Sequence, residues 1–432
     1  MFEKFIIEQN SHWQKGALEA GFFREEMKGL VKYTNIRQII ALVGIRRCGK
    51  STIVKQLINF LLAEKKINPK NILFLNLEAP QLNQFREDPN NLQNLFDEYL
   101  SLVDPKGKVY IFLDEVQFFS NWQVFVKSLY EKGKVKFFIT GSNSRLLSAE
   151  MATLLSGRSI TKKIYPFNFQ EIAKLSKLEM ADRIEILSNE NKLKKVFGEY
   201  LKNGGFPEVV LEKKQKMKEE ILINYYKNIL YQDIIPRFEV KKTKEIEKLL
   251  LYLISNIGRS YSYNSLAKFL KMNDKTVKEY IGFFEESFLL FEISNYQYSL
   301  KKQENYPKKV YTADNGFISA VSFSFSENSG SFLENVVFLE LLAGGKEIYY
   351  HLGKQECDFV IKEKNRIVEA MQVCYNMDEK NRKREVKGLL EALEKYKLKG
   401  GLILTYNQEE EFVEAGKTIK LMPVWKWLLL GK

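Results

Sequence analysis

The fold of the first part of this 432-residue chain is indicated by the stretch Gly44-Ile45-Arg46-Arg47-Cys48-Gly49-Lys50-Ser51-Thr52. Before it, residues 38–44 form a continuous apolar run that ends at a glycine, as a strand buried on both faces does. After it, the pattern over 50–65 is helical. The stretch fits G-x-x-x-x-G-K-[ST], the loop in which backbone N–H groups surround a phosphate. The sequence therefore predicts a phosphate-binding loop rather than a plain glycine-rich turn.

All nine residues of this loop are expected to contact a nucleotide, with Lys50 reaching the terminal phosphates and the Ser51 hydroxyl ligating magnesium. A second apolar run, 109–113, leads directly into Asp114 and Glu115. We expect Asp114 to hold the magnesium ion, directly or through water, and Glu115 to act as general base toward the attacking water. The two motifs together predict a site for ATP and Mg²⁺.

A third apolar run, 136–140, ends in polar side chains at the same predicted edge of a sheet. One of them would sense the γ-phosphate, and the sequence leaves open which of Thr140, Ser142 and Asn143 does so. Arg145 and Arg158 are candidates for stabilising charge in the transition state, with a solvated surface role as the alternative. The predicted catalytic residues are therefore Lys50, Glu115 and Arg158.

Composition limits the class of protein. Hydrophobic residues make up 45% of the chain and charged residues 28%, which is typical of globular domains. The net charge of +13 fits either a polyanionic partner or a lysine-rich solubilising surface. Three cysteines without a CxxC pair and two histidines argue against disulfides and structural zinc. We find neither a secretory signal nor an apolar run long enough to cross a membrane, so we expect a cytoplasmic protein.

The remaining patterns predict further domains. Apolar runs that alternate with helical stretches predict a parallel α/β domain over 1–165. A helical, polar stretch over 166–215 predicts a lid. Over 216–324, helices are followed by a tight turn, another helix and two strands, which is the order of a winged helix-turn-helix. The last part, 325–432, alternates a helix with strands and predicts a third, α/β domain.

Several motifs, spread over nearly the whole chain, resemble those of one family: the bacterial and archaeal AAA-like (AAA_14) P-loop ATPases whose C-terminal region is a domain of unknown function, DUF4143. The resemblance rests on the loop with both Arg46 and Arg47 and on the segments 113–117, 139–144, 155–158, 165–167, 204–207 and 422–429. Gly205-Phe-Pro207 is also similar to a Gly-x-Pro element of signal-transducing ATPases with numerous domains. That likeness implies that Pro207 lies near the adenine; without it, the segment indicates only a loop breaker.

The helix over 274–284 would present a polar face to nucleic acid. We expect Lys275, Thr276, Lys278 and Tyr280 to face solvent, and Val277, Ile281 and Phe284 to face inward. The following segment is predicted to form a wing whose lysines contact the DNA backbone, with tyrosines interleaved among them: Lys301, Lys302, Lys308, Lys309, Tyr298 and Tyr306. The alternative for such a domain is a protein-protein or autoinhibitory role, with Glu279, Glu285 and Glu286 diluting the positive face.

The family resemblance implies a restriction-endonuclease-like, PD-(D/E)XK fold for the last domain. In that fold Glu334, Asp358 and an E-x-K strand would hold magnesium. Here the strand reads Glu369-Ala-Met-Gln372-Val-Cys374, so the lysine is missing in either alignment. Lys354, Lys362 and Lys364 are the nearest replacements in sequence. We therefore expect a degenerate domain, and we favour Glu334 and Asp358 as acids at a helix surface and a strand end over a role as metal ligands.

The sequence thus predicts an ATPase or molecular switch that couples ATP hydrolysis to domain rearrangement. The alternatives are an ATP-gated, metal-dependent DNA nuclease and a DNA-binding regulator in which the nucleotide is structural. The predicted partners are ATP or ADP, DNA through the winged helix, and either a second copy of the chain or another protein; a membrane is not expected.

Overall fold

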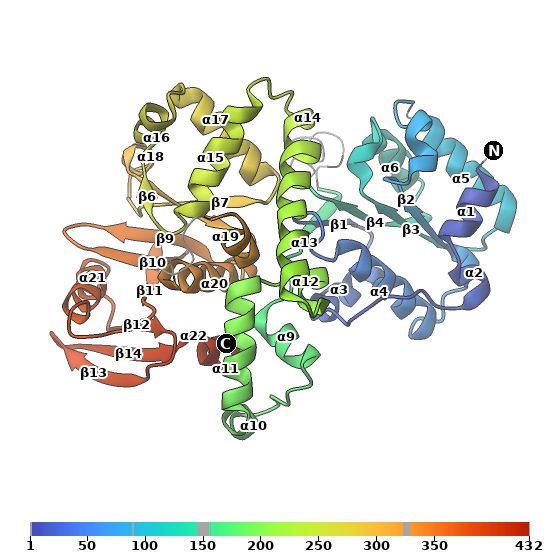
Figure 1. Cartoon of the computed structure of the whole chain (residues 1–432). Helices are drawn as coiled ribbons and strands as arrows, with labels where there is room; N and C mark the ends of the chain where they lie inside the picture. The colour runs from blue at the N-terminus through green and yellow to red at the C-terminus, as the bar shows by residue number, and fades with distance from the viewer. Residues whose placement is uncertain (1, 89, 145–154, 156, 323–328, 432) are drawn as a thin grey trace. The chain divides into compact units, whose positions relative to one another are not determined.

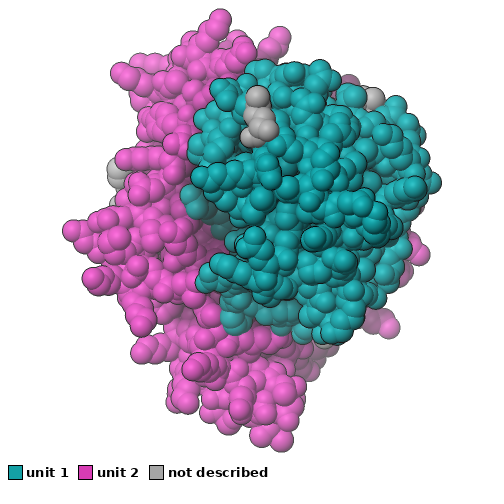
Figure 2. Space-filling view, turned by 90° about the vertical axis from the view of Figure 1, so that its right-hand side faces the viewer, with its two compact units in different colours: residues 1–165, 286–288 teal, residues 166–285, 289–432 magenta. Residues whose placement is uncertain are grey.

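The computed structural model describes residues 2–88, 90–144, 155, 157–322 and 329–431 (Figure 1). They divide into two compact units, which Figure 2 colours separately. Unit 1 contains residues 1–165 and 286–288, and unit 2 contains residues 166–285 and 289–432. The candidate arginine Arg145 lies outside the described residues.

Unit 1 is built on a parallel five-stranded sheet with the order β2-β3-β4-β1-β5. Its strands are β1 (Ile39–Val43), β2 (Ile72–Asn76), β3 (Val109–Asp114), β4 (Val135–Gly141) and β5 (Ser159–Lys163). The α-helices are α1 (Glu3–Gln9), α2 (His12–Lys15), α3 (Glu26–Leu30), α4 (Lys50–Ala63), α5 (Asn90–Val103) and α6 (Trp122–Glu131). The predicted parallel α/β sheet is confirmed; β5 was not foreseen, because its side chains are half-exposed and polar.

The apolar runs form this sheet because both of its faces are covered. In Figure 1, α3 and α4 lie on one side of the sheet and α5 and α6 on the other. Every residue of β1, β3 and β4 is buried, and Phe112 stacks on Phe138 of the neighbouring strand with ring centroids 4.9 Å apart. Because the strands are parallel, the residues that follow β1, β3 and β4 meet at one edge of the sheet.

Unit 2 begins with a helical region. Its elements are α9 (Phe169–Leu175), α10 (Arg183–Ser188), α11 (Glu190–Asn203), α12 (Pro207–Leu211), α13 (Gln215–Asn228), a π-helical turn (Ile229–Ile234) and α14 (Ile235–Arg237). Asn168 starts α9 through a capping box with Glu171, in which each side chain accepts a hydrogen bond from the other residue's backbone N–H.

A helix–turn–helix and a three-stranded sheet, β6-β8-β7, follow in unit 2. The elements are α15 (Thr243–Ser255), β6 (Ser260–Tyr261), α16 (Tyr263–Leu270), α17 (Asp274–Glu286), β7 (Leu290–Ser294), α18 (Leu300–Asn305), β8 (Lys308–Thr312) and α19 (Asn315–Val321). On α17, Val277, Ile281 and Phe284 are buried as predicted. The prediction for Tyr280 is wrong: it is buried, with its ring beside that of Phe283.

The last part of unit 2 is a six-stranded mixed sheet with the order β13-β14-β12-β11-β10-β9. Its elements are α20 (Ser329–Ala343), β9 (Glu347–Leu352), β10 (Glu356–Glu363), β11 (Arg366–Val373), α21 (Arg382–Lys395), β12 (Gly400–Thr405), β13 (Glu410–Glu414), β14 (Lys417–Pro423) and α22 (Val424–Leu430). Val360, Leu389 and Ile403 lie in the core between α21 and the sheet. No helix within the described ranges is long and apolar enough to span a bilayer.

Candidate functional site

The loop between β1 and α4 has a shape that depends on two glycines. A side chain at Gly44 would place its Cβ 2.0 Å from the carbonyl oxygen of Ile164. Gly49 is the N-cap of α4 and has φ 102°, which side-chain-bearing residues rarely adopt. The loop can therefore turn tightly from the end of β1 into the first turn of α4.

Lys50 is buried at the centre of the site, with 3% of its surface exposed. Its Nζ donates to the carbonyl oxygens of Gly44 (3.1 Å) and Ile45 (3.3 Å) and lies 3.3 Å from Glu115 Oε1. Burial alone would lower the pKa of Lys50, but the Glu115 carboxylate beside it raises that pKa above its ordinary value. The side chain is thus a fixed positive charge held against the loop.

Asp114 ends β3 and is 2% exposed. Its Oδ1 accepts a hydrogen bond from the Thr140 hydroxyl at 2.5 Å, and it is also hydrogen-bonded by Ser51. Burial, with the Glu115 carboxylate nearby, raises the pKa of Asp114 to about 6. The structure therefore brings the two predicted magnesium ligands, Ser51 and Asp114, into contact.

Glu115 follows with a backbone conformation that is unusual for a residue with a side chain, at φ 56°. Its N–H donates to the Thr140 hydroxyl at 2.9 Å, and its Oε2 accepts from Gln117 Nε2 at 2.6 Å. Although burial opposes ionisation, Lys50 and Gln117 hold the pKa of Glu115 below its ordinary value. Glu115 is therefore ionised at neutral pH, as a proton acceptor must be.

The three polar residues after β4 make different contacts. Thr140 bridges Asp114 and the backbone of Glu115, while the Ser142 hydroxyl accepts a hydrogen bond from Gln117 Nε2 at 3.2 Å. Asn143 is 5% exposed. Thr140 is thus engaged in positioning the two acids, which leaves Ser142 and Asn143 as the candidates for sensing the γ-phosphate.

A buried arginine that belongs to no sequence motif, Arg24, contacts the loop. Arg24 is 1% exposed, and its guanidinium donates to the carbonyl oxygens of Cys48 and Tyr165, each at 2.8 Å. Cys48 itself is fully buried, and Arg46 forms an ion pair with Glu78. Arg24 lies 20 residues before the loop and outside any motif, so no sequence pattern predicts this contact.

Arg158 lies away from the loop of its own chain. It precedes the amino end of β5, where its carbonyl oxygen accepts from Ile39 N at 2.8 Å, and its guanidinium is 3.4 Å from Glu131 Oε1. The loop follows the opposite, carboxyl end of β1, and a five-residue strand is about 16 Å long. The structure therefore does not bring Arg158 to the other predicted site residues within one chain.

The Gly204–Pro207 segment is fixed inside unit 2. Asp314 accepts hydrogen bonds from Gly205 N (2.6 Å) and Gly316 N (2.8 Å), and Phe167 N donates to the Gly205 carbonyl at 2.8 Å. Burial raises the pKa of Asp314 to about 7. Pro207 starts α12, where its missing N–H costs nothing. These contacts explain the two glycines by packing, and the adenine contact of Pro207 stays a prediction.

The lysines predicted on the wing differ in exposure. Lys301 and Lys302 are exposed, and Lys308 is half-buried, with its Nζ donating to Ser294 Oγ and to the Gln303 carbonyl at 3.0 Å each. The prediction that Lys309 contacts DNA is wrong, because Lys309 is 1% exposed. It lies on the central strand of a three-stranded sheet, and its side chain points into the protein interior toward carboxyl groups.

The acids predicted for the last domain do come together. Asp358 N donates to Gln372 Oε1 at 3.2 Å, and both Asp358 and Glu334 lie within 3.2 Å of Lys309 Nζ. Gln372 Nε2 in turn donates to Glu385 Oε2 at 2.6 Å. Lys362, one of the expected replacements for the missing lysine, is instead paired with Glu347 on the surface.

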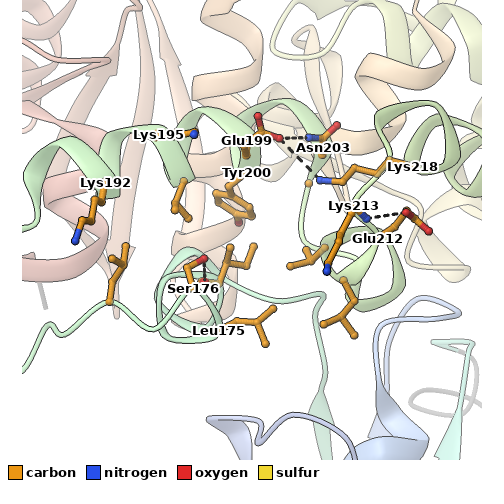
Figure 3. Close-up of a pocket in the computed structure, with 16 residues that line it drawn as sticks. Leu175, Ser176, Lys192, Lys195, Glu199, Tyr200, Asn203, Glu212, Lys213 and Lys218 are labelled. Carbon is orange, nitrogen blue, oxygen red and sulfur yellow. Dashed lines mark hydrogen bonds and ion pairs between the residues drawn. The ribbon is translucent and has the colours of Figure 1, made fainter.

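A separate cavity of about 560 Å³ lies in the helical region of unit 2 (Figure 3). Apolar side chains of α9, α11 and α12, such as Leu175 and Leu211, line it together with lysines. Lys218 Nζ lies 3.9 Å from Glu199, and Glu212 accepts hydrogen bonds from two following backbone N–H groups. Because both apolar and charged side chains line the cavity, its lining does not favour one class of ligand.

The site in unit 1 fits a nucleotide with magnesium. No side chain caps the first turn of α4 in the described structure, so its N–H groups and the positive end of the helix dipole are available to an anion. Lys50 adds a buried positive charge at the same place. The Ser51 hydroxyl and the Asp114 carboxylate supply the oxygen ligands that Mg²⁺ prefers.

Family models match three consecutive parts of the chain: an AAA domain over residues 36–173, a domain of unknown function (DUF8612) over 194–328, and a domain of unknown function (DUF4143) over 329–427. An uncharacterized protein of Methanocaldococcus jannaschii, MJ1544, is 35% identical over 408 residues, which cover 91% of this chain and 88% of that protein. An uncharacterized protein of Haemophilus influenzae is 30% identical over 409 residues, 93% of this chain and 97% of that protein.

Two solved structures were also matched. The Aeropyrum pernix ORC1 protein in complex with DNA is 11% identical and has a TM-score of 0.32, with 68% of this chain and 90% of that chain covered. The Thermotoga maritima RuvB Holliday junction branch migration motor is 15% identical and has a TM-score of 0.29, with 64% and 91% covered. Scores this low carry no argument about function.

Proposed function

Because this chain belongs to the family of archaeal and bacterial proteins in which an AAA domain precedes a DUF4143 region, we propose that it binds ATP with Mg²⁺ in unit 1 and hydrolyses it. One observation carries the proposal: the buried Lys50 and Asp114 lie together with the partly exposed Glu115 beside the uncapped first turn of α4. Charged groups removed from water in this way are costly unless they serve a ligand or pair closely.

Each residue has a role in this proposal. The loop from Gly44 to Thr52 surrounds the phosphates, and Lys50 exchanges its contacts with the loop carbonyls for contacts with the terminal phosphates. Ser51 and Asp114 would hold Mg²⁺, which neutralises charge on the phosphate oxygens when it is bound. Glu115 orients the attacking water and accepts its proton.

The proposal assigns two further roles, a sensor of the γ-phosphate and an arginine that stabilises charge in the transition state. Ser142 or Asn143 senses the γ-phosphate from the end of β4. Arg158 acts from a neighbouring copy of the chain, as an arginine supplied in trans, since it lies at the far edge of the sheet in its own chain. Hydrolysis would then require a homo-oligomer.

The test uses two substitutions with controls of matched chemistry. Lys50→Ala should abolish tight ATP binding, because it removes the buried positive charge. Glu115→Gln should keep binding and stop turnover, since an amide keeps the shape but does not accept the proton. Lys65→Ala and Glu64→Gln change exposed residues just after α4 and should leave both properties unchanged. Undiminished hydrolysis by Glu115→Gln would refute the assignment.

We further propose that ATP turnover drives rearrangement of the other domains: a helical lid over 166–215, a winged helix over 216–324 and a nuclease-like domain over 325–432. The order helix, turn, helix and antiparallel strands in the middle segment supports a winged helix. Cleavage of DNA that survives Lys50→Ala would favour the nuclease alternative. Tight ATP binding without turnover would favour the regulator.

DNA is the proposed partner of the middle segment. Exposed lysines on α16, α17, α18 and the turn between α16 and α17 support this proposal, and Tyr298 is also 81% exposed. The lysines are Lys268, Lys271, Lys275, Lys278, Lys301 and Lys302. Affinity for duplex DNA should fall with salt, with a log–log slope of about −0.9 per phosphate contacted, and Lys301→Ala/Lys302→Ala should flatten that slope. Absence of binding at low salt would make the segment a protein-interaction domain instead.

A further inference from the structure

One lysine of unit 2 is buried in a way that the ATPase reaction does not use. Lys309 lies on β8, the central strand of the three-stranded sheet, and is 1% exposed. Burying an ammonium group costs several kcal/mol unless other groups compensate its charge. The compensating groups come from the last part of the chain, which is the DUF4143 region.

The surroundings of the ammonium match its three N–H donors. Lys309 Nζ lies 3.2 Å from Glu334 Oε1 on α20, 2.8 Å from Glu356 Oε1 and 2.9 Å from Asp358 Oδ1, both on β10. The ring of Tyr350 lies on another side, with its centroid 5.6 Å from Nζ. One primary ammonium thus meets three carboxyl groups and an aromatic ring.

The carboxyl groups are themselves held in place. Asp358 Oδ2 accepts from Val373 N at 2.9 Å, and Glu334 Oε1 accepts from the Tyr311 hydroxyl at 2.7 Å. Tyr311 lies two residues after Lys309 on the same strand, and therefore on the same face. Contacts with β11 and β8 thus position the carboxyl groups of Asp358 and Glu334 around the Lys309 ammonium.

The Lys309 ammonium occupies the centre of the carboxyl cluster. The three carboxyl oxygens lie 2.8–3.2 Å from its nitrogen, which are ordinary N–H···O hydrogen-bond distances. Among the residues described, no group of three or more acids, histidines or cysteines is arranged to hold a metal ion. Burial alone would lower the pKa of Lys309, but Asp358 and Glu334 hold it well above its ordinary value.

We propose that Glu334, Glu356 and Asp358 form a receptor for the Lys309 ammonium, which fills the cation position of the nuclease-like domain and clasps the three-stranded sheet to that domain. The acids that a nuclease would use for magnesium are committed to an internal cation. The DUF4143 region is then joined to the middle segment through a buried charge.

The experiment uses the full-length protein with Lys309→Ala, and Lys216→Ala as the control, because Lys216 is exposed on α13. Hydrogen exchange is followed in peptides from β8, α20 and β10. Lys309→Ala should speed exchange in all three by about tenfold or more, since carboxyl groups that lose their common cation pack less firmly. Lys216→Ala should exchange like the original protein.

Chemical rescue identifies the ligand class. Propylammonium chloride restores the atoms that Lys309→Ala removes and should recover much of the lost protection, whereas sodium chloride at the same ionic strength should not. Equal recovery with both salts, or unchanged exchange in Lys309→Ala, would overturn the proposal.

Two further measurements keep the proposal testable if Lys309→Ala does not fold. Lys309→Met/Glu334→Gln, which alters both members of the 3.2 Å contact, should lose less stability than the two single effects added together; strict additivity would overturn the proposal. Calorimetry of the original protein with Mn²⁺ should detect no site at this position. Tight Mn²⁺ binding that Asp358→Asn abolishes would show that the acids serve a metal instead.

Discussion

Thr140→Val tests how the two acids of the proposed ATPase site are held. The Thr140 hydroxyl donates to Asp114 Oδ1 at 2.5 Å and accepts from Glu115 N at 2.9 Å, and the residue is fully buried. Valine keeps the branched shape and replaces the hydroxyl with a methyl group that forms no hydrogen bond. A single substitution therefore leaves a buried carboxylate with one hydrogen bond fewer and a buried N–H without its acceptor.

The cost follows from these two contacts. Leaving a buried polar group unsatisfied costs about 1–3 kcal/mol, and more where the partner is charged. Ser51 still donates to Asp114, which reduces the loss at that end. We therefore expect Thr140→Val to lower the free energy of unfolding by about 3 kcal/mol. MgATP binding should weaken as well, because Asp114 and Glu115 lose their fixed positions.

Thr140→Ser is the matched control, since it keeps the hydroxyl and loses one methyl group, at about 1 kcal/mol. Urea denaturation of the full chain gives the stability of each variant, and titration with a fluorescent ATP analogue in Mg²⁺ gives the affinity. Thr140→Val should be worse than Thr140→Ser in both measurements. If the two variants are equal in stability and affinity, the bridging hydroxyl does not position the acids and the reasoning fails.

Three other substitutions test the packing of the two units. His12 is buried, with its Nε2 3.1 Å from the Ile72 carbonyl, and burial lowers its pKa to about 4. The unfolded chain therefore takes up a proton between pH 6.5 and 4 that the folded chain does not, so the free energy of unfolding falls as pH falls. From pH 7.5 to 5.0 the expected loss is about 2 kcal/mol. Urea denaturation at the two pH values should show this loss in the original protein and not in His12→Gln. Gly205→Ala would place a Cβ 2.1 Å from the Phe167 carbonyl oxygen and should destabilise unit 2 by about 1–3 kcal/mol. Gly282→Ala, on α17 with no atom within 4 Å of the new Cβ, should instead stabilise by about 0.5–1 kcal/mol; thermal unfolding that ranks the two glycine variants the other way would contradict the packing argument.

The parallel sheet of unit 1 could be predicted because its signals are local. Apolar runs of about five residues predicted β1 to β4, and the helical pattern that begins at residue 50 predicted the start of α4 at Lys50. Contacts between distant residues gave no such signal. Arg24 supports the loop from outside every motif, and Thr140 could be placed beside Asp114 but not distinguished in role from Ser142.

In unit 2 the errors concern the side on which a residue packs. Tyr280 follows the polar pattern of α17, yet its ring is buried and lies beside that of Phe283, because a tyrosine supplies apolar surface as readily as a hydroxyl. The strands β13 and β14 were not foreseen, since alternating charged residues over 410–420 resemble a solvated loop as much as an edge hairpin.

Lys309 connects two predictions that the sequence kept separate. The sequence predicted that Lys309 lies on the wing of the middle segment. It also predicted that the last domain lacks the lysine that would accompany its acids. Lys309 accounts for both, because β8 places it on the face that carries Tyr311, within 3.2 Å of Glu334 and within 2.9 Å of Asp358. A search for the missing lysine near Asp358 in sequence fails for a physical reason: a buried charge is compensated by whatever group the fold brings within hydrogen-bond distance, and here that group comes from a different sheet, 49 residues away. It follows that the middle segment and the acids of the last domain cannot be altered independently at this position, since removing the Lys309 ammonium would leave the three carboxyl groups without their common contact.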